Sequence, residues 1–106
     1  AALMGNTEKI AKALSDPIRY RILKMLAESS TDCCSLPGEK GRPGLCNCEL
    51  MESLGMIQSR VSYHLKELAE AGLVNEEPRG RWKFYRLNQE ALRQYLEQLI
   101  GDFKLG

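Results

Sequence analysis

The sequence predicts a mainly α fold with a β-hairpin, of the winged helix-turn-helix class. Two stretches with helical spacing of apolar residues are separated by a turn of three or four residues that contains Gly55. Two runs of β-forming residues follow at once, and Gly80 supplies the tight turn between them. Because the chain has 106 residues and one more helical stretch, we expect a single domain over 1–106 in the order α-α-loop-α-α-β-β-α.

The first two helices are marked by residues that start or stop a helix. Helical apolar spacing begins at Asn6 or Thr7 and continues to Leu14, and the next three residues, Ser15-Asp16-Pro17, interrupt it. We expect the Asp16 side chain to cap a second helix that continues to about residue 28. From 29 to 44 the composition changes to Ser, Thr, Asp, Pro and Gly, which predicts a long loop.

Two further helices are predicted after the loop. We expect Asn47 to cap the first of them, which Gly55 ends after about two turns. The second is expected to run from about Gln58 to Ala71, and Gly72 closes it. One side of this second helix is apolar and the other is polar, so one side is expected to pack on the core and the other to face outward.

A β-hairpin, or wing, is predicted next. Its strands are expected at 73–77 and 82–87, joined by Pro78-Arg79-Gly80-Arg81. Between 79 and 86 the chain has four basic residues and no acidic one, although its formal net charge is only +1. The wing is therefore a basic segment of a nearly neutral protein. Asn88 is then expected to cap a last helix with a wide apolar face.

The polar helix face and the wing together predict a surface that binds double-stranded operator DNA. In this fold class the second helix enters the major groove, and the wing touches the flanking backbone or a narrow minor groove. His64 lies one residue off the polar face, and we expect a structural, partly packed role for it. The residues expected to contact DNA are Gln58, Ser59, Arg60, Ser62, Tyr63 and Lys66 on the helix, and Arg79, Arg81 and Lys83 on the wing.

The main chemical signal is a group of four cysteines within sixteen consecutive positions. The sequence has no membrane-spanning run and no signal-peptide pattern, so we expect a cytoplasmic protein with free thiols and no membrane partner. Thiolates select soft ions, and a helix start lowers the pKa of nearby thiols. The candidate ligands are Cys33, Cys34, Cys46 and Cys48, and the candidate ions are As(III), Sb(III), Cd(II), Pb(II) and Zn(II).

The cysteine spacing favours a pyramidal site over a closed zinc knuckle. Structural zinc sites normally use C-x2-4-C pairs, whereas Cys33 and Cys34 are adjacent and Cys46 and Cys48 are separated by one residue. Such pairs are awkward for a tetrahedral knuckle. They are workable for three thiolates around a trivalent metalloid, which needs no fourth ligand.

Three segments of the sequence resemble the arsenic-repressor (ArsR/SmtB) family of metal-sensing repressors. They are LSDPIRYRILKML, GLCNCELMESLGMIQSRVSYHLKELAEAGLV and RGRWKFYRL, and the resemblance covers about 14 to 87. It implies a homodimeric repressor that leaves its operator when an inducer binds and so releases resistance genes. It also implies operator-reading positions at Gln58, Ser59, Ser62 and Tyr63, and a Cys-x-Cys pair at the start of the helix that precedes them.

The sequence departs from the family pattern at two places. Met51 stands where arsenite-responsive members often have a third cysteine, and the N-terminal arm has no cysteine, unlike members that sense cadmium or lead. A zinc site on the last helix, known in some relatives, lacks its histidines and acids here. We therefore hypothesise that Cys46 and Cys48, with Cys34 or Cys33, bind As(III), methylated arsenite or Sb(III). Closing the loop onto this site would reposition the helix that begins near Cys46, and this movement would tilt the recognition helices.

The first and last helices predict the dimer interface. Together they carry more apolar surface than a chain of this size easily covers, and a two-fold dimer places two recognition helices about 34 Å apart, one DNA turn. The residues that suggest this are Leu3, Leu92, Tyr95, Leu99, Ile100 and Phe103.

Several other functions stay open at this point. The same cysteines suit a Cd-, Pb- or Zn-responsive repressor, or a thiol-redox switch that forms a disulfide. A winged-helix module that binds protein and holds structural zinc is a further alternative, as are inert buried cysteines. An enzyme is disfavoured, because the chain has one histidine, no visible nucleophile-base arrangement and no glycine-rich phosphate loop.

Overall fold

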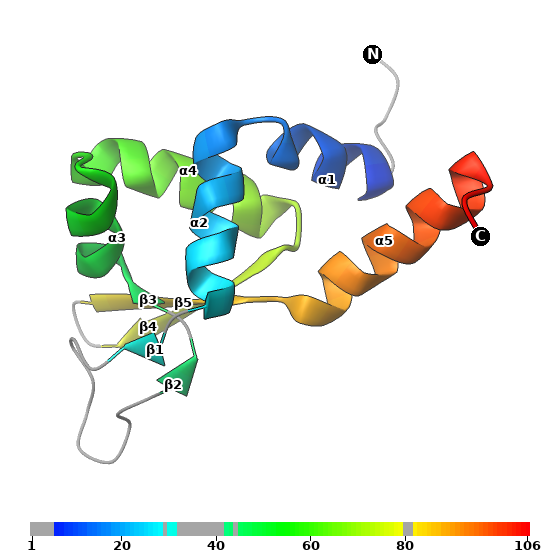
Figure 1. Cartoon of the computed structure of the whole chain (residues 1–106). Helices are drawn as coiled ribbons and strands as arrows, with labels where there is room; N and C mark the ends of the chain where they lie inside the picture. Colours follow the sequence, from blue (N-terminus) through cyan, green and yellow to red (C-terminus); the bar gives the residue numbers. More distant parts are fainter. Residues whose placement is uncertain (1–5, 29, 32–41, 44, 80–81) are drawn as a thin grey trace.

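The computed structural model describes residues 6–28, 30–31, 42–43, 45–79 and 82–106. These residues form five helices and two antiparallel sheets, one of two strands and one of three in the order β3-β5-β4 (Figure 1). The helices are α1 (Asn6–Leu14), α2 (Pro17–Glu28), α3 (Asn47–Leu54), α4 (Gln58–Glu70) and α5 (Gln89–Phe103), and the strands are β1 (Ser30–Thr31), β2 (Arg42–Pro43), β3 (Leu45–Cys46), β4 (Val74–Arg79) and β5 (Trp82–Leu87).

The predicted winged helix-turn-helix order is confirmed, and three short strands are added to it. Ser30 and Thr31 pair with Pro43 and Arg42, so β1 and β2 bring the two ends of the predicted loop together. β3 joins the wing, because Leu45 pairs with Tyr85 and Cys46 pairs with Phe84. Strands of two residues are too short to give an alternating pattern, and the sequence therefore did not predict them.

Local capping chemistry fixes the helix ends. The Oδ1 of Asp16 accepts a hydrogen bond from the N–H of Ile18 at 2.8 Å, and the Oδ1 of Asn88 accepts one from the N–H of Ala91 at 3.1 Å. Both predicted caps are thus confirmed. The cap predicted at Asn47 is wrong, because α3 begins at Asn47 and its N-cap residue is Cys46, in an extended conformation.

Two further boundaries differ from the prediction. α4 ends at Glu70 with Ala71 as its C-cap, one residue earlier than predicted. β4 begins at Val74 and continues to Arg79, which pairs with Trp82. Arg79 and the preceding proline therefore belong to the strand ladder rather than to the turn.

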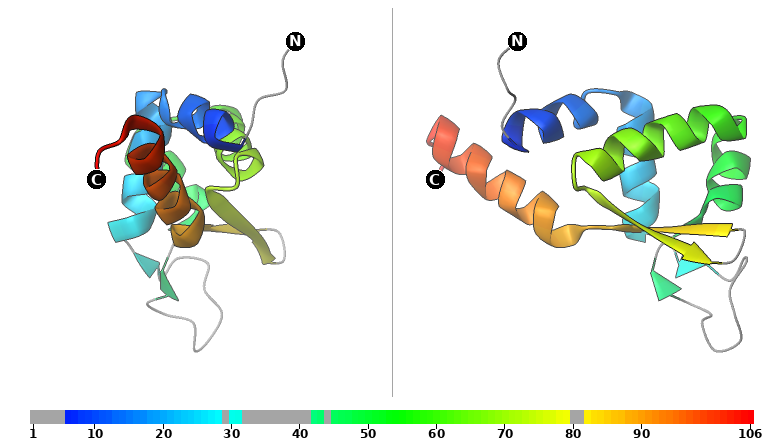
Figure 2. Two further views of the ribbon diagram at one scale, coloured as in Figure 1. Left: turned by 90° about the vertical axis from the view of Figure 1, so that its right-hand side faces the viewer. Right: turned by 180° about the vertical axis from the view of Figure 1, so that it is seen from behind.

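The hydrophobic core lies between α1–α4 and the three-stranded sheet (Figures 1 and 2). Each helix of this group contributes its apolar stripe, and burial of these side chains is the main favourable term in folding. The largest fully buried side chains include Ile10, Ile22, Leu50, Val61, Leu65, Leu68 and Leu73.

α5 packs against this core with its partly buried Ala91, Leu92 and Tyr95. It has no buried residue, and its C-terminal half extends beyond the body formed by α1–α4 (Figure 2). Its exposed apolar side chains include Leu96, Ile100 and Phe103, the last with 68% of its surface exposed. Among the described helices, none has the length and hydropathy needed to cross a membrane.

Candidate DNA-binding surface and cysteine pair

A tight turn sets the angle between α3 and α4. Gly55 has a φ of 63°, in the left-handed region that favours glycine, and it is the C-cap of α3. The N–H of Met56 then donates to the carbonyl of Met51 at 3.2 Å, which completes the helix end. Leu50 of α3 and Val61 of α4 are both fully buried in the same core. The two helices are thus held in a helix-turn-helix arrangement.

The start of α4 presents the polar residues that the sequence singled out. The buried residues of this helix are Val61, His64, Leu65 and Leu68. All the predicted DNA contacts on α4 are exposed, namely Gln58, Ser59, Arg60, Ser62, Tyr63 and Lys66. The N-terminal amides of α4 and its polar face therefore lie at the protein surface, where a nucleic acid can reach them.

The wing carries the second group of predicted DNA contacts. Lys83 of β5 is exposed, and its Nζ lies 3.1 Å from a carboxylate oxygen of Glu76 on β4. An exposed ion pair of this kind contributes little stability, so the lysine can readily exchange the carboxylate for another anion. Arg79 ends β4, but its side chain lies outside the described residues, and Arg81 lies wholly outside them.

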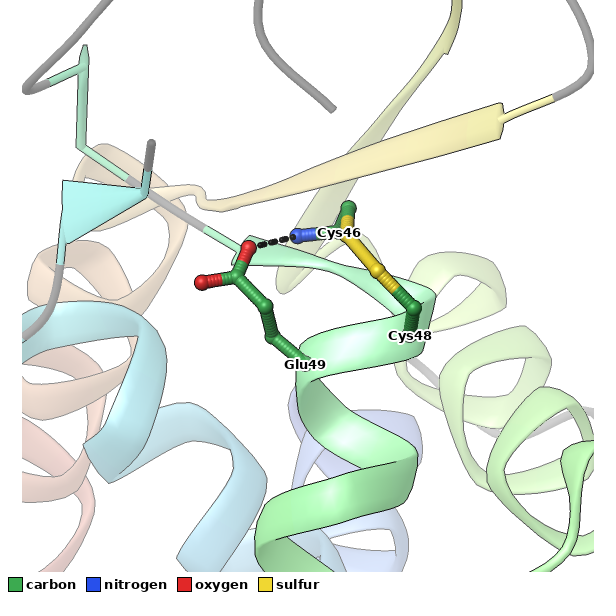
Figure 3. The surroundings of a disulfide bond; sticks show 3 residues. All are labelled: Cys46, Cys48 and Glu49. Carbon is green, nitrogen blue, oxygen red and sulfur yellow. Dashed lines mark hydrogen bonds between the residues drawn. A yellow bond between two sulfur atoms is a disulfide. The ribbon is translucent and has the colours of Figure 1, made fainter. Parts of the chain in front are cut away.

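Cys46 and Cys48 lie together at the junction of β3 and α3. Cys46 ends β3 and caps α3, and Cys48 follows in the first helical turn. Their Cα atoms are 5.5 Å apart and their Sγ atoms are joined in a disulfide (Figure 3). The sequence predicted free thiols at both positions, so the structure differs in their oxidation state. It brings the two sulfur atoms together as the prediction required.

The surroundings of this pair are tightly packed on one side. Cys46 is 1% exposed, whereas Cys48 is only partly buried. The N–H of Cys46 donates to Oε1 of Glu49 at 3.2 Å, which is the return half of a capping box (Figure 3). Cys33 and Cys34 lie outside the described residues. Within the described residues, no three His, Cys, Asp or Glu side chains form a group with metal-binding geometry.

A buried polar contact joins α2 to α4. The sequence predicted a packed His64 but not its partner, Arg19. His64 is 6% exposed, which confirms its packed role, and Arg19 is 9% exposed. Nη1 of Arg19 lies 3.3 Å from Nδ1 of His64, and Nε of Arg19 donates to the carbonyl of Ala13 at 2.8 Å. A signal for Arg19 was present, because it lies on the same helical stripe as the buried Ile22 and Leu23.

These contacts displace two pKa values. Burial lowers the pKa of His64 below its ordinary value, with Arg19 adding to the effect and the Asp16 carboxylate opposing it. Burial alone would raise the pKa of Asp16. The Ile18 N–H, together with the charge of Arg19 and the charge that His64 carries once it is protonated in acid, nevertheless brings it below its ordinary value. The imidazole is therefore held neutral and the carboxylate is held ionised at neutral pH.

Comparison with known proteins agrees with this geometry. Residues 39–76 match the family described as "Bacterial regulatory protein, arsR family". The arsenical resistance operon repressor of Bacillus subtilis (strain 168) is 34% identical over 103 residues, which cover 96% of this chain and 86% of that protein.

Solved structures share the fold. The crystal structure of an ArsR family transcriptional regulator superposes with a TM-score of 0.74 at 19% identity, over 95% of this chain and 96% of that one. The solution structure of a homodimeric winged helix-turn-helix DNA-binding domain from Mycobacterium bovis, a possible ArsR-family regulator, gives 0.65 at 22% identity, over 100% and 94%. The chain belongs to the ArsR family of bacterial regulatory proteins, and it is a transcriptional regulator rather than an enzyme.

Proposed function

We propose that this chain is a transcriptional repressor that binds operator DNA as a homodimer and releases it when As(III) binds cysteine thiolates. The single observation that carries the proposal is the pairing of Cys46 with Cys48 at the entrance to the helix-turn-helix. Similarity to the arsenical resistance operon repressor of Bacillus subtilis supports arsenic as the inducer.

Support for the DNA interface comes from the exposed polar start of α4. Gln58 and Ser62 are four residues apart, as are Ser59 and Tyr63, so the members of each pair lie on the same side of the helix, with side chains able to reach base edges. Arg60 and Lys66 supply charge for phosphates, as do Lys83, Arg79 and Arg81 of the wing. The helix would lie in the major groove and the wing beside it.

Support for a homodimer comes from α5 and the groove beside it. An open groove between α2 and α5 is lined mostly by apolar side chains, including Tyr20, Leu92, Tyr95 and Leu96. Tyr20 and Leu96 are more than half exposed in the single chain. A second copy that covers this face would remove the exposed apolar surface and pair two recognition helices about 34 Å apart. The related Mycobacterium bovis domain is described as homodimeric.

Support for a thiolate site comes from the position of β1 next to β3. At least one of Ser30 and Thr31 has its Cα within 8 Å of the Cα of Cys46. Cys33 follows Thr31 by two residues and Cys34 by three, which is a reach of about 7 to 10 Å for an extended chain. One of these two cysteines would therefore complete a set of three sulfurs. Sb(III), Cd(II), Pb(II) and Zn(II) are the other ions that such donors accept.

Inducer binding requires the reduced pair. The disulfide first exchanges with cellular thiols, which are oxidised as the two cysteines gain the electrons and protons. Ligation would then pull on Cys46, which is both a β3 residue and the cap of α3. To take a repressor from 99% bound to 1% bound, the inducer must favour the low-affinity form by about 5.5 kcal/mol, which several metal-sulfur bonds can supply.

The test measures release of an operator selected from a random DNA pool, by fluorescence anisotropy in reductant with and without arsenite. Arsenite is expected to release the wild type and to leave Cys46→Ser/Cys48→Ser bound. Cys33→Ser and Cys34→Ser are matched controls for each other, because one loop ligand is expected and the response should survive in one of them. Release of the double variant by arsenite would contradict the proposal.

A redox-sensing regulator is the second candidate, because a disulfide between Cys46 and Cys48 is the oxidised product that such a sensor would form. The same assay separates the two functions. Release by peroxide without arsenite, lost in Cys48→Ser, together with no effect of arsenite in reductant, would favour the redox sensor.

A further inference from the structure

The buried contact between Arg19 and His64 joins three helices. The guanidinium of Arg19 extends from α2, donates through Nε to the last turn of α1 at Ala13, and approaches His64 of α4 through Nη1. Both side chains are at least nine-tenths buried. Neither belongs to the polar face or to the cysteine pair. A charged group in such a place needs its hydrogen bonds, because an unpartnered buried charge is costly.

The contact determines the protonation state of His64. A guanidinium has only donors, so the nitrogen that faces it, Nδ1, must accept. His64 is therefore neutral, with its proton on Nε2. A protonated imidazole carries hydrogens on both nitrogens and has no acceptor. Protonation would thus break the contact and place two positive charges together in the interior.

The imidazole also touches a residue of the polar face of α4. The rings of Tyr63 and His64 meet edge to face, with centroids 5.3 Å apart and planes at 63°. Tyr63 is 56% exposed, and it is one of the residues we expect to contact DNA. The chain of contacts thus runs from Ala13 of α1 through Arg19 and His64 to a side chain on the outer face of α4.

We propose that Arg19 and His64 are positioning residues for DNA binding: neutral His64, held by Arg19, fixes Tyr63 and the start of α4, and protonation of His64 weakens the complex with DNA. This inference rests on the proposed DNA-binding function. It assigns to the protein a response to acid that is separate from its response to a thiol ligand.

The charges around the ring come from α2 and α4. Asp16, the cap that precedes α2, and Arg19 of α2 are on one side of this group, and Arg60 and Glu67 belong to α4. Lys9 and Lys12 of α1 line an open pocket together with Arg19, Glu67 and Glu70. The carboxylates favour protonation, whereas burial and the two arginines oppose it more strongly, so the pKa of His64 is lowered. The ring is neutral at pH 7 and becomes charged at a more acidic pH than an ordinary histidine does.

The sign of the effect makes the test specific. Added positive charge normally strengthens binding to DNA, because it adds an attraction for phosphate. The positioning role predicts the opposite, namely a Kd that rises by up to about tenfold per pH unit below the titration midpoint of His64. His64 is the only histidine in the chain, so a titration midpoint below the ordinary histidine pKa, absent in His64→Gln, is assigned to it.

The experiment measures Kd for a selected operator by fluorescence anisotropy from pH 8 to pH 5 at constant ionic strength, with circular dichroism at each pH to count only folded protein. His64→Gln keeps an acceptor for Arg19 but does not titrate, so it should bind within about threefold of the wild type at pH 8 and lose the acid weakening. Arg19→Lys should weaken binding about tenfold even when folded, because a single ammonium nitrogen does not reproduce the fixed fork in which Nε and Nη1 donate from two separate atoms. Arg21→Lys, an exposed position of the same helix, is the matched control and should bind as the wild type does.

A measurement on the unmodified chain covers the case in which the variants do not fold. Nitrogen NMR of the single imidazole should report Nδ1 without a proton at pH 8, and its midpoint should coincide with that of the Kd profile. A Kd that is constant or falls toward acid would overturn the inference alone, as would a His64→Gln profile equal to that of the wild type. Failure of the wild type to bind any DNA at low salt would overturn the proposed function and this inference with it.

Discussion

Cys46 of β3 pairs with Phe84 of β5, and Cys46 is also the N-cap residue of α3. One backbone position therefore joins the wing to the helix that leads into α4. Cys46 is 1% exposed and Phe84 is 7% exposed, so both residues of this junction are buried. Because packed interiors do not deform continuously, we expect a change in the sulfur bonding of Cys46 to be passed by direct contact to both units that are proposed to touch DNA.

The capping box at this junction gives the first prediction. Glu49→Ala removes the carboxylate that accepts the N–H of Cys46, and we expect it to lower the free energy of unfolding by about 1 kcal/mol. Glu52→Ala changes an exposed carboxylate of the same helix and should stay within about 0.5 kcal/mol of the wild type. Urea denaturation followed by circular dichroism measures both. Equal losses would mean that the cap contributes nothing of its own.

The structure also separates what local sequence determines from what it does not. The caps at Asp16 and Asn88 were predicted because each depends on a side chain and an amide two or three residues away. The strand at Leu45 and Cys46 was not, because it is two residues long and exists only through its pairing with Tyr85 and Phe84.

The candidate site likewise has residues that local sequence predicts and residues that only the packing of distant segments brings together. The exposed face of α4 follows from helical periodicity, and the sequence identified its residues. The contact of Arg19 with His64 joins residues 45 positions apart, and only the packing of α2 on α4 brings them together. The position of His64, one residue off the polar face, suggested a packed histidine without identifying its partner. The expected contribution of Cys33 or Cys34 stays a prediction, since both lie outside the described residues.

Tyr85 gives a prediction about alkaline pH. Burial raises the pKa of this tyrosine to about 12, and the nearby Glu76 carboxylate adds to the effect. The neutral phenol is favoured in the folded state, so this stabilisation is complete below the ordinary value near 10 and is lost as the pH rises toward 12. Ultraviolet titration of the folded protein should show one of the four tyrosines ionising last, and Tyr85→Phe should remove that component. A single common transition in folded protein would contradict it.

The exposed face of α5 gives a prediction about assembly. Ile100→Glu places a charge among apolar side chains that a second copy is expected to cover, so we expect it to dissociate the dimer. Sedimentation equilibrium should change from twice the chain mass of 12.0 kDa to that mass itself. Glu97→Gln alters an exposed polar position of the same helix and should leave the dimer intact. A wild type that sediments at 12.0 kDa at micromolar concentration would refute the interface.

The lysines of the reading face and the wing give a prediction about salt dependence. Lys66 and Lys83 are both exposed, and the contact of Lys83 with Glu76 is weak enough to be exchanged for a phosphate. Lys66→Gln and Lys83→Gln should each reduce the slope of log K against log salt by about 0.9, because each removes one released counterion. Lys104→Gln, in the exposed segment after α5, removes the same charge away from the proposed surface and should leave the slope unchanged. If all three variants changed the slope equally, the attraction would depend on net charge alone, and neither α4 nor the wing would form the interface.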